Sequence, residues 1–247
     1  MQIIPIGARE TNLMYIIVGP QNELVFVDPV EPMKIEKEAE QFLAAPETKI
    51  AVLTTHHHED HSAGNAKIKR MHPTAAIYAG SHQSFATHIC KDSDVISIGA
   101  LRIECMHIPC HTQDSFAYTV YDTTSKESAA VFVGDTLFYL GCGIFFEGTA
   151  EMMHSALKKI SGLPSDTIVY YGHEYKESNL QFRRMLIPDP EGLCSSERIF
   201  LTVGEERKHN FYMNTSLVEK NKEFSGKSPT EIIHTLRQMK NAYNSQK

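Results

Sequence analysis

The fold of this chain is decided by one stretch, Ile50-Ala51-Val52-Leu53-Thr54-Thr55-His56-His57-His58-Glu59-Asp60-His61. Residues 50–54 form a short apolar run, which indicates a strand buried on both faces. His56, His58 and Asp60 follow at intervals of two, and in extended backbone side chains two residues apart point the same way. His61 comes where the chain turns into a predicted helix, so it faces another direction. This spacing predicts ligands for two neighbouring metal ions rather than one.

Three further candidate ligands stand at the ends of predicted strands. They are His111 after residues 101–107, Asp135 after residues 129–133 and His173 after residues 167–170. A buried strand followed by a polar residue is how a rigid scaffold places a site on its loops. His57 points away from its neighbours, so it is interpreted, like Glu59, as a spacer that lies beside the site or at the surface.

The rest of the chain divides into a sheet-rich part and a helical part. Up to residue 175, short β signals alternate with single helices, which indicates two β-sheets with helices packed outside. Those helices are predicted at residues 32–44, 61–71 and 150–160. From about Lys176 helices are predicted almost throughout, and Ser228-Pro229-Thr230-Glu231 is a capping box that opens the last one. The chain is therefore predicted to be α+β, with the metal ligands in a domain at residues 1–175 and a helical domain at residues 176–247.

The composition is that of an ordinary globular protein and excludes several functions. A formal net charge of -6 and a pI of about 6.1 argue against a nucleic-acid binder that neutralises phosphates. No apolar run approaches the roughly 18 residues of a membrane span, and the first residues lack the basic and apolar regions of a signal peptide. The cysteines form no CxxC pair, which indicates reduced thiols and a cytoplasmic protein. They are Cys90, Cys105, Cys110, Cys142 and Cys194.

Three blocks of the sequence resemble one known family. The first block is 55–65, the middle block is 134–138 with 141–143 and 147–150, and the third is 171–175 with Asn179, Leu180 and Phe182. Together with the pattern H-x-H-x-D-H, they resemble the metallo-β-lactamase superfamily, and within it glyoxalase II, the hydroxyacylglutathione hydrolases. The blocks span most of residues 1–185, whereas the tail is similar only in length and helical character.

The resemblance implies an αββα sandwich followed by a small helical domain, and it divides the candidate ligands between two ions. One ion would take His56, His58 and His111, the other Asp60, His61 and His173, and Asp135 would bridge them. We take Asp60 and Asp135 as catalytic residues as well as ligands. Asp28 resembles a buried aspartate of the superfamily that orients a ligand. A turn aspartate before Pro29 fits the sequence equally well.

Two divalent ions held in this way allow hydrolysis without a serine or cysteine nucleophile. They lower the pKa of bound water from about 15.7 toward 7 and polarise a carbonyl group. The His and Asp donors suit zinc best, with iron and manganese as alternatives. The resemblance supplies the substrate, a 2-hydroxyacyl thioester such as S-D-lactoylglutathione, cleaved to D-lactate and free thiol in methylglyoxal detoxification. A thiolate with a pKa of about 8.5 leaves without a strong general acid.

The residues that would contact the thiol depart from the family pattern. The matching positions are Ile144, Phe146, Tyr175 and Asn179. Glutathione-using members carry a Lys and a Tyr at the first two positions, and only the last two are kept here. In the tail, Asn214 and Leu217 stand where the family places basic residues, and the substitutes considered are Lys208, Lys220 and Lys222.

Each lost contact between a lysine and a substrate carboxylate costs about 1–3 kcal/mol, or about ten- to hundredfold in binding. The hypothesis from the sequence is therefore a carrier thiol other than glutathione, or a derivative without the free carboxylate, such as trypanothione.

Other enzymes of the same fold are the nearest alternatives. A β-lactamase would differ at the second metal site, and a nuclease would carry a basic face, which the charge of -6 disfavours. A persulfide dioxygenase shares much of the pattern but holds one iron. A catalytically silent metal-binding module comes from another class, although structural zinc is usually closed and rich in cysteine ligands. We expect a monomeric enzyme for a small-molecule thioester, with no nucleic-acid or membrane partner.

Overall fold

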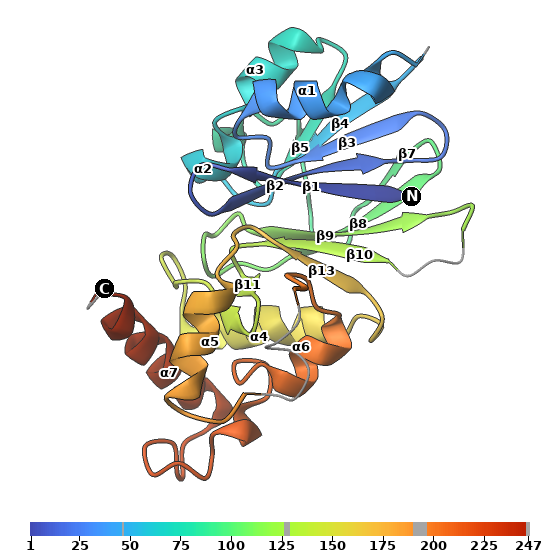
Figure 1. Cartoon of the computed structure of the whole chain (residues 1–247). Helices are drawn as coiled ribbons and strands as arrows, with labels where there is room; N and C mark the ends of the chain where they lie inside the picture. Colours follow the sequence, from blue (N-terminus) through green and yellow to red (C-terminus); the bar gives the residue numbers. More distant parts are fainter. Residues whose placement is uncertain (46, 126–128, 190–196, 246–247) are drawn as a thin grey trace.

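The computed structural model describes residues 1–45, 47–125, 129–189 and 197–245. Two β-sheets pack face to face, with helices on both outer faces (Figure 1). Among the described residues, one sheet has six strands in the order β1-β2-β3-β4-β5-β6, and the other has five in the order β13-β10-β9-β8-β7. The predicted α+β sandwich with a helical C-terminal region is thereby confirmed.

The six-stranded sheet is formed by the first third of the chain. Its strands are β1 (Gln2–Ala8), β2 (Asn12–Val18), β3 (Glu23–Val27), β4 (Lys49–Leu53), β5 (Ala76–Ala79) and β6 (His88–Ile89). The helices of this part are α1 (Pro32–Leu43), α2 (Glu59–Ser62), α3 (Asn65–Met71) and the 3-10 turn η1 (His82–Ser84). The single helix predicted over residues 61–71 is wrong, because the helix begins earlier and divides at Gly64. A Cβ at Gly64 would lie 1.8 Å from the Pro29 carbonyl oxygen, so the chain packs there too closely for any side chain.

The five-stranded sheet is covered by the remaining helices, which lie in the lower half of Figure 1. Its strands are β7 (Val95–Ile98), β8 (Leu101–His107), β9 (Phe116–Asp122), β10 (Ala130–Gly134) and β13 (Ile168–Tyr171), and a small hairpin of β11 (Leu137–Phe138) and β12 (Gly141–Cys142) follows β10. The helices are α4 (Ala150–Ser161), α5 (Lys176–Arg184), α6 (Val203–His209), η2 (Thr215–Leu217) and α7 (Pro229–Asn244). The predicted capping box opens α7, where the Glu231 carboxylate accepts a hydrogen bond from Ser228 N at 2.8 Å.

Three apolar clusters hold the layers together. The cluster between the sheets contains Tyr15 and Phe132, whose rings meet edge to face at 5.2 Å. A second cluster packs α1 on the six-stranded sheet. The third contains Val169 of β13, Leu157 of α4 and Leu236 of α7, so the tail packs directly on the sheet-rich part. The division of the chain between residues 175 and 176 stays a prediction.

A buried carboxyl group also joins the tail to the sheet. Glu206 of α6 accepts hydrogen bonds from the Tyr171 hydroxyl at 2.7 Å, from Leu140 N at 3.1 Å and from Asn210 Nδ2 at 2.8 Å. Burial raises the pKa of Glu206 to about 7, because the charged form loses its hydration. The position of α6 is therefore fixed by polar contacts as well as by apolar packing.

The directions of the strands bring their carboxyl ends to one edge. β3 and β4 are parallel, and so are β10 and β13. β8 and β10 are both antiparallel to β9, so they run in the same direction as each other. Within each sheet, the loops that follow these strands therefore leave at a common edge.

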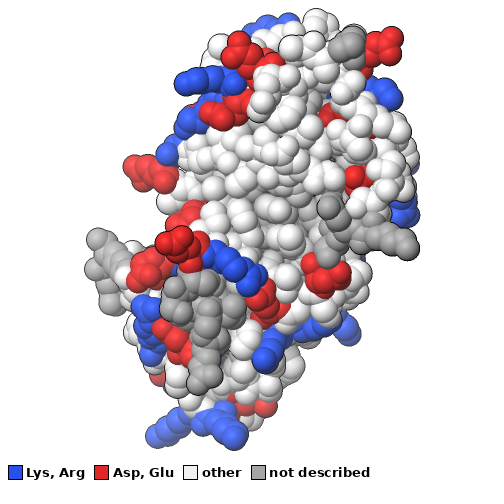
Figure 2. Space-filling model, turned by 45° about the vertical axis from the view of Figure 1, so that its right-hand side comes forward, with Lys and Arg blue, Asp and Glu red and all other residues white. Residues whose placement is uncertain are grey.

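The surface charges, the helices and the cysteines of the structure can be compared with what the composition predicted. In the described part of the chain, no helix is both long and apolar enough to cross a bilayer. On the face shown in Figure 2, acidic and basic side chains are interspersed around a broad uncharged band. Four of the five cysteines are buried free thiols, as predicted, and Cys194 lies outside the described residues.

Candidate metal centre

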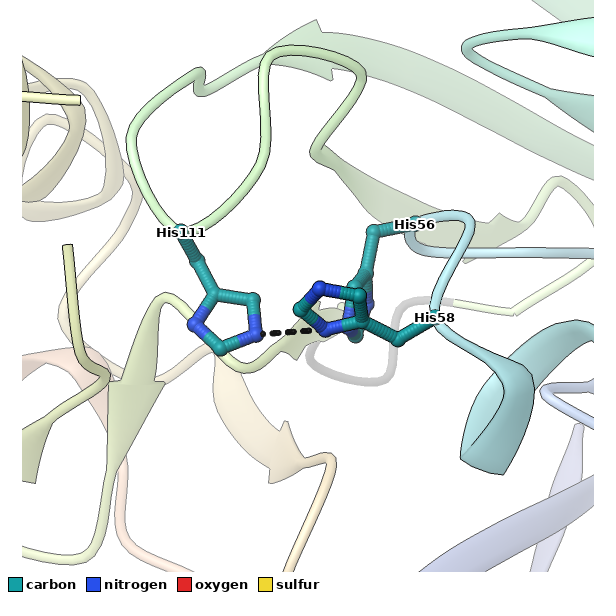
Figure 3. A group of neighbouring side chains, drawn as sticks. All are labelled: His56, His58 and His111. Carbon is teal, nitrogen blue, oxygen red and sulfur yellow. Dashed lines mark hydrogen bonds between the residues drawn. The ribbon is translucent and has the colours of Figure 1, made fainter. Parts of the chain in front are cut away.

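The first group of candidate ligands consists of three histidines from two loops (Figure 3). His56 and His58 follow β4, and His111 follows β8. His58 Nδ1 lies 3.1 Å from both His56 Nε2 and His111 Nε2. Nitrogens bound to one tetrahedral metal at about 2.0–2.1 Å are separated by roughly 3.3 Å. The three nitrogens therefore converge with nearly the spacing that one shared ion requires.

The second group lies beside the first and contains a carboxylate. His61 Nε2 and His173 Nε2 are 3.3 Å apart, and Asp60 Oδ2 lies 3.6 Å from the former and 3.3 Å from the latter. Asp60 and His61 belong to α2, whereas His173 follows β13. These donors also fit one divalent ion.

Asp135 lies between the two groups. Its Oδ2 is 3.5 Å from His111 Nε2 and 3.2 Å from His173 Nε2, and its Oδ1 is 3.3 Å from His61 Nε2. Oδ1 is buried and makes no hydrogen bond of good geometry, as expected of an oxygen placed for a metal. The fold and these donor groups support a dinuclear site for divalent metals, with Asp135 at the boundary.

The second ring nitrogens of four histidines are held by the protein. The pairs are His56 Nδ1 with Thr55 Oγ1 (3.1 Å), His61 Nδ1 with Asp28 Oδ2 (2.9 Å), His111 Nδ1 with the Ile144 carbonyl (3.0 Å) and His173 Nδ1 with Thr11 Oγ1 (3.0 Å). Such contacts fix the ring orientation and leave the other nitrogen to a metal. Asp28 therefore lies where the resemblance put it. It also accepts hydrogen bonds from Thr55 N and Oγ1 at 2.8 and 2.6 Å.

The end of the β1–β2 turn and the first residue of β2 hold two candidate ligands, which the sequence did not indicate. Asn12 Nδ2 donates to the carbonyl and to Oδ2 of Asp60, at 2.9 and 3.0 Å, and Thr11 contacts His173. No motif marks these two residues, because their partners are 48 and 162 positions away in the sequence. Their role is visible only once the two sheets are in contact.

The protonation states differ between the two groups. Burial lowers the pKa values of His56, His58 and His111, so these rings are neutral and free to bind a metal. In the second group, burial acts in the same direction on His173 but is outweighed by Asp135 and Asp60, which raise its pKa to about 9. The hydrogen bond from His173 in turn lowers the pKa of Asp60. A cation would therefore replace protons in the second group.

Three of the four predicted substrate contacts lie next to the centre. The Phe146 ring, 60% exposed, covers His58 and His111 at centroid distances of 5.5 and 5.1 Å. Tyr175 stacks on His173 at 4.9 Å, and the carbonyl of Ile144 holds His111. The fourth, Asn179, is buried elsewhere, with its Nδ2 donating to the Tyr139 carbonyl at 3.1 Å.

The basic residues near Ile144 come from α7 and from the segment just before it. A groove of about 740 Å³ runs from Ile144 between the start of α4 and α7, and it is lined by Lys227, His234 and Arg237 among others. Arg237 is only 6% exposed, donates to the Cys142 carbonyl at 2.7 Å and leaves its Nε without a partner. The predicted tail positions stay a prediction, but they lie outside this groove, which forms where α7 packs against α4. Those positions, Asn214, Leu217, Lys208, Lys220 and Lys222, do not line the groove.

Comparisons with known proteins agree with this geometry. The sequence profile of the metallo-beta-lactamase superfamily matches residues 8–92. A probable hydroxyacylglutathione hydrolase of Schizosaccharomyces pombe is 37% identical over 254 residues, which cover 97% of this chain and 98% of that protein. The cytoplasmic hydroxyacylglutathione hydrolase of Arabidopsis thaliana is 35% identical, covering 98% of this chain and 99% of that protein. The crystal structure of ETHE1 from Myxococcus xanthus has a TM-score of 0.67 at 24% identity, over 97% of this chain and 91% of that one, and shows a shared fold.

Proposed function

Because the chain belongs to the hydroxyacylglutathione hydrolase, or glyoxalase II, family of the metallo-β-lactamase superfamily, we propose that it hydrolyses S-D-lactoylglutathione to D-lactate and glutathione. The observation that carries this proposal is the convergence of two donor groups on Asp135. Family membership also favours the hydrolase over the persulfide dioxygenase and the silent binding module.

The chain's own residues have distinct tasks in this reaction. His56, His58 and His111 would hold one ion, Asp60, His61 and His173 the other, and Asp135 would contact both. Bound divalent ions supply Lewis-acid activation of the carbonyl and of water near neutral pH. We propose zinc, because imidazole nitrogens and carboxylate oxygens are donors it favours, with iron and manganese as alternatives. The thiolate product needs no strong general acid, in keeping with the ionised state of Asp60 and Asp135.

The carrier thiol is proposed to be glutathione. The relatives' names favour it, and Arg237 of α7 is a basic residue in the groove beside Ile144. The Arg237 guanidinium group lines the groove and can pair with a substrate carboxylate, a charge-assisted hydrogen bond worth about 1.5–3 kcal/mol. Ile144 and Phe146 instead offer an apolar wall. We also propose a cytoplasmic monomer without nucleic-acid or membrane partners.

The test compares kcat/KM for lactoyl thioesters of glutathione, trypanothione and a small thiol. We expect the glutathione thioester to be preferred. Arg237→Gln should raise its KM about ten- to hundredfold and leave the small thioester unchanged. Lys227→Gln, in the same groove, is the matched control. A preference for trypanothione, or an unchanged KM in Arg237→Gln, would contradict the assignment of the thiol.

Metal content tests the reaction class separately. Two ions per chain together with release of free thiol support the hydrolase. One iron per chain favours an oxygenase, and two ions without hydrolysis favour a silent module.

A further inference from the structure

His57 stands within the histidine run but belongs to none of the candidate ligand groups found among the described residues. Its Nδ1 lies 2.7 Å from Asp114 Oδ1, and its Nε2 lies 3.8 Å from Glu147 Oε1. The ring is therefore placed between two carboxylates that belong to two other loops. A spacer at the surface would have no such partners.

Asp114 is the centre of this arrangement. It is 9% exposed, and besides His57 it accepts hydrogen bonds from Ser81 Oγ at 2.6 Å and from Thr112 Oγ1 at 2.7 Å. Ser81 follows β5, and Thr112 directly follows the candidate ligand His111. A Cβ at Gly80 would lie 2.2 Å from the Asp114 carbonyl, so these loops are in close contact. One carboxylate thus joins the loops that follow β4, β5 and β8.

Glu147 extends these contacts to the segment that lies beside His58 and His111. Its carboxylate accepts a hydrogen bond from Gln113 N at 2.6 Å, and its carbonyl accepts one from the Gln113 side chain. The same segment carries the Ile144 carbonyl that holds His111 and the Phe146 ring that covers His58. The loop of His111 is therefore fixed from both sides.

We propose that His57 and Asp114 form a positioning pair, which sets the separation of His58 and His111 and so controls binding of the ion in the first group. This inference rests on the proposed metal centre. The second group is held by different residues, since Asn12 contacts Asp60, Asp28 contacts His61 and Thr11 contacts His173. Loss of the pair should therefore weaken one ion and leave the other. Mutations of residues that orient metal ligands typically cost about 10–100-fold in metal affinity.

The experiment measures zinc affinity by competition with a chromophoric chelator in the metal-free full-length chain. The variants are His57→Gln, Asp114→Ala and Asp114→Asn, with Asp92→Asn as the matched control. Asp92 also bonds the β8 region, through His107 N at 2.8 Å, but does not contact a ligand loop. We expect His57→Gln and Asp114→Ala to bind one zinc ion as tightly as the wild type does. The other zinc ion should bind about 10–100-fold more weakly than in the wild type. Asp114→Asn keeps an acceptor oxygen for His57 and should be intermediate.

Each outcome decides the matter. The positioning pair would be overturned if Asp114→Ala bound both zinc ions with wild-type affinity. It would also be overturned if both affinities fell equally, because that result indicates a general folding defect. Circular dichroism and the melting temperature of the metal-free variants identify such a defect. A wild-type chain that binds fewer than two ions would overturn the pair together with the metal centre. Two bound ions without thioester hydrolysis would overturn the proposed function alone.

Discussion

Replacing Gly172 by alanine would place a methyl group against the carboxylate that separates the two candidate metal groups. A Cβ at this position lies 2.2 Å from Asp135 Oδ1 and 2.9 Å from His61 Cε1. Ordinary van der Waals contact begins at 3.4 Å, so the carboxylate must retreat by about 1.2 Å. It has little space to do so, because the nitrogens of His61, His111 and His173 lie 3.2–3.5 Å from its oxygens.

This displacement is large compared with the tolerance of metal–ligand distances, but its cost in folding free energy is modest. Ligand distances are held to within about 0.2 Å, and a misplacement of about 1 Å typically costs about 100-fold in rate. We therefore expect kcat/KM for the thioester to fall by at least about 100-fold in Gly172→Ala. The overpacking itself should cost only about 1–3 kcal/mol of folding free energy.

The assay combines thioester hydrolysis, metal content by mass spectrometry and thermal unfolding. Gly7→Ala is the matched control, because a Cβ there meets nothing within 4 Å. It should keep the wild-type rate and both ions. If Gly172→Ala also keeps two ions and the wild-type rate, Asp135 does not contact both ions.

Two further predictions concern metal removal and pH. Chelation should abolish thioester hydrolysis and lower the melting temperature by roughly 10 °C, since a ligand at 1,000 times its Kd stabilises the folded protein by about 4 kcal/mol. Added zinc should restore both the activity and the melting temperature. An unchanged melting temperature after chelation would argue against a bound metal. Burial favours the protonated Glu206 in the folded chain, so its contribution to stability is full below about pH 4.5 and lost as the pH rises to about 7. Across this interval, the unfolding free energy of the wild type should fall by about 3 kcal/mol relative to Glu206→Gln, as measured by urea denaturation. Parallel pH curves would contradict this.

The positions of the candidate ligands could be predicted because they depend on local sequence. His56 and His58 follow a strand and share one group, and His111, Asp135 and His173 each follow a strand of their own. The predicted common direction of Asp60 with His56 and His58 was wrong, because Asp60 lies in α2 and belongs to the second group. Within each sheet, strand direction then brings the loops to a common edge. The fold class follows from the same alternation of strands and helices.

The contacts that hold those ligands could not be predicted, because they join distant parts of the chain. Asn12 and Thr11 are single polar residues in a hairpin, and nothing nearby indicates their partners. The spacing of His57 gave its direction but not Asp114, which is 57 residues away. Arg237 was missed for a similar reason, since its proximity to Ile144 requires α7 to pack against α4.

The division of the ligands between the two sheets has a consequence for assembly. His56, His58, Asp60 and His61 follow the six-stranded sheet, whereas His111, Asp135 and His173 follow strands of the other. Each ion would thus cross-link two halves that are synthesised one after the other. The nascent first half carries only part of either coordination shell, so full metal loading must await docking of the second half. Bound metal would then slow the separation of the two sheets. The mature protein would therefore unfold more slowly than the metal-free chain.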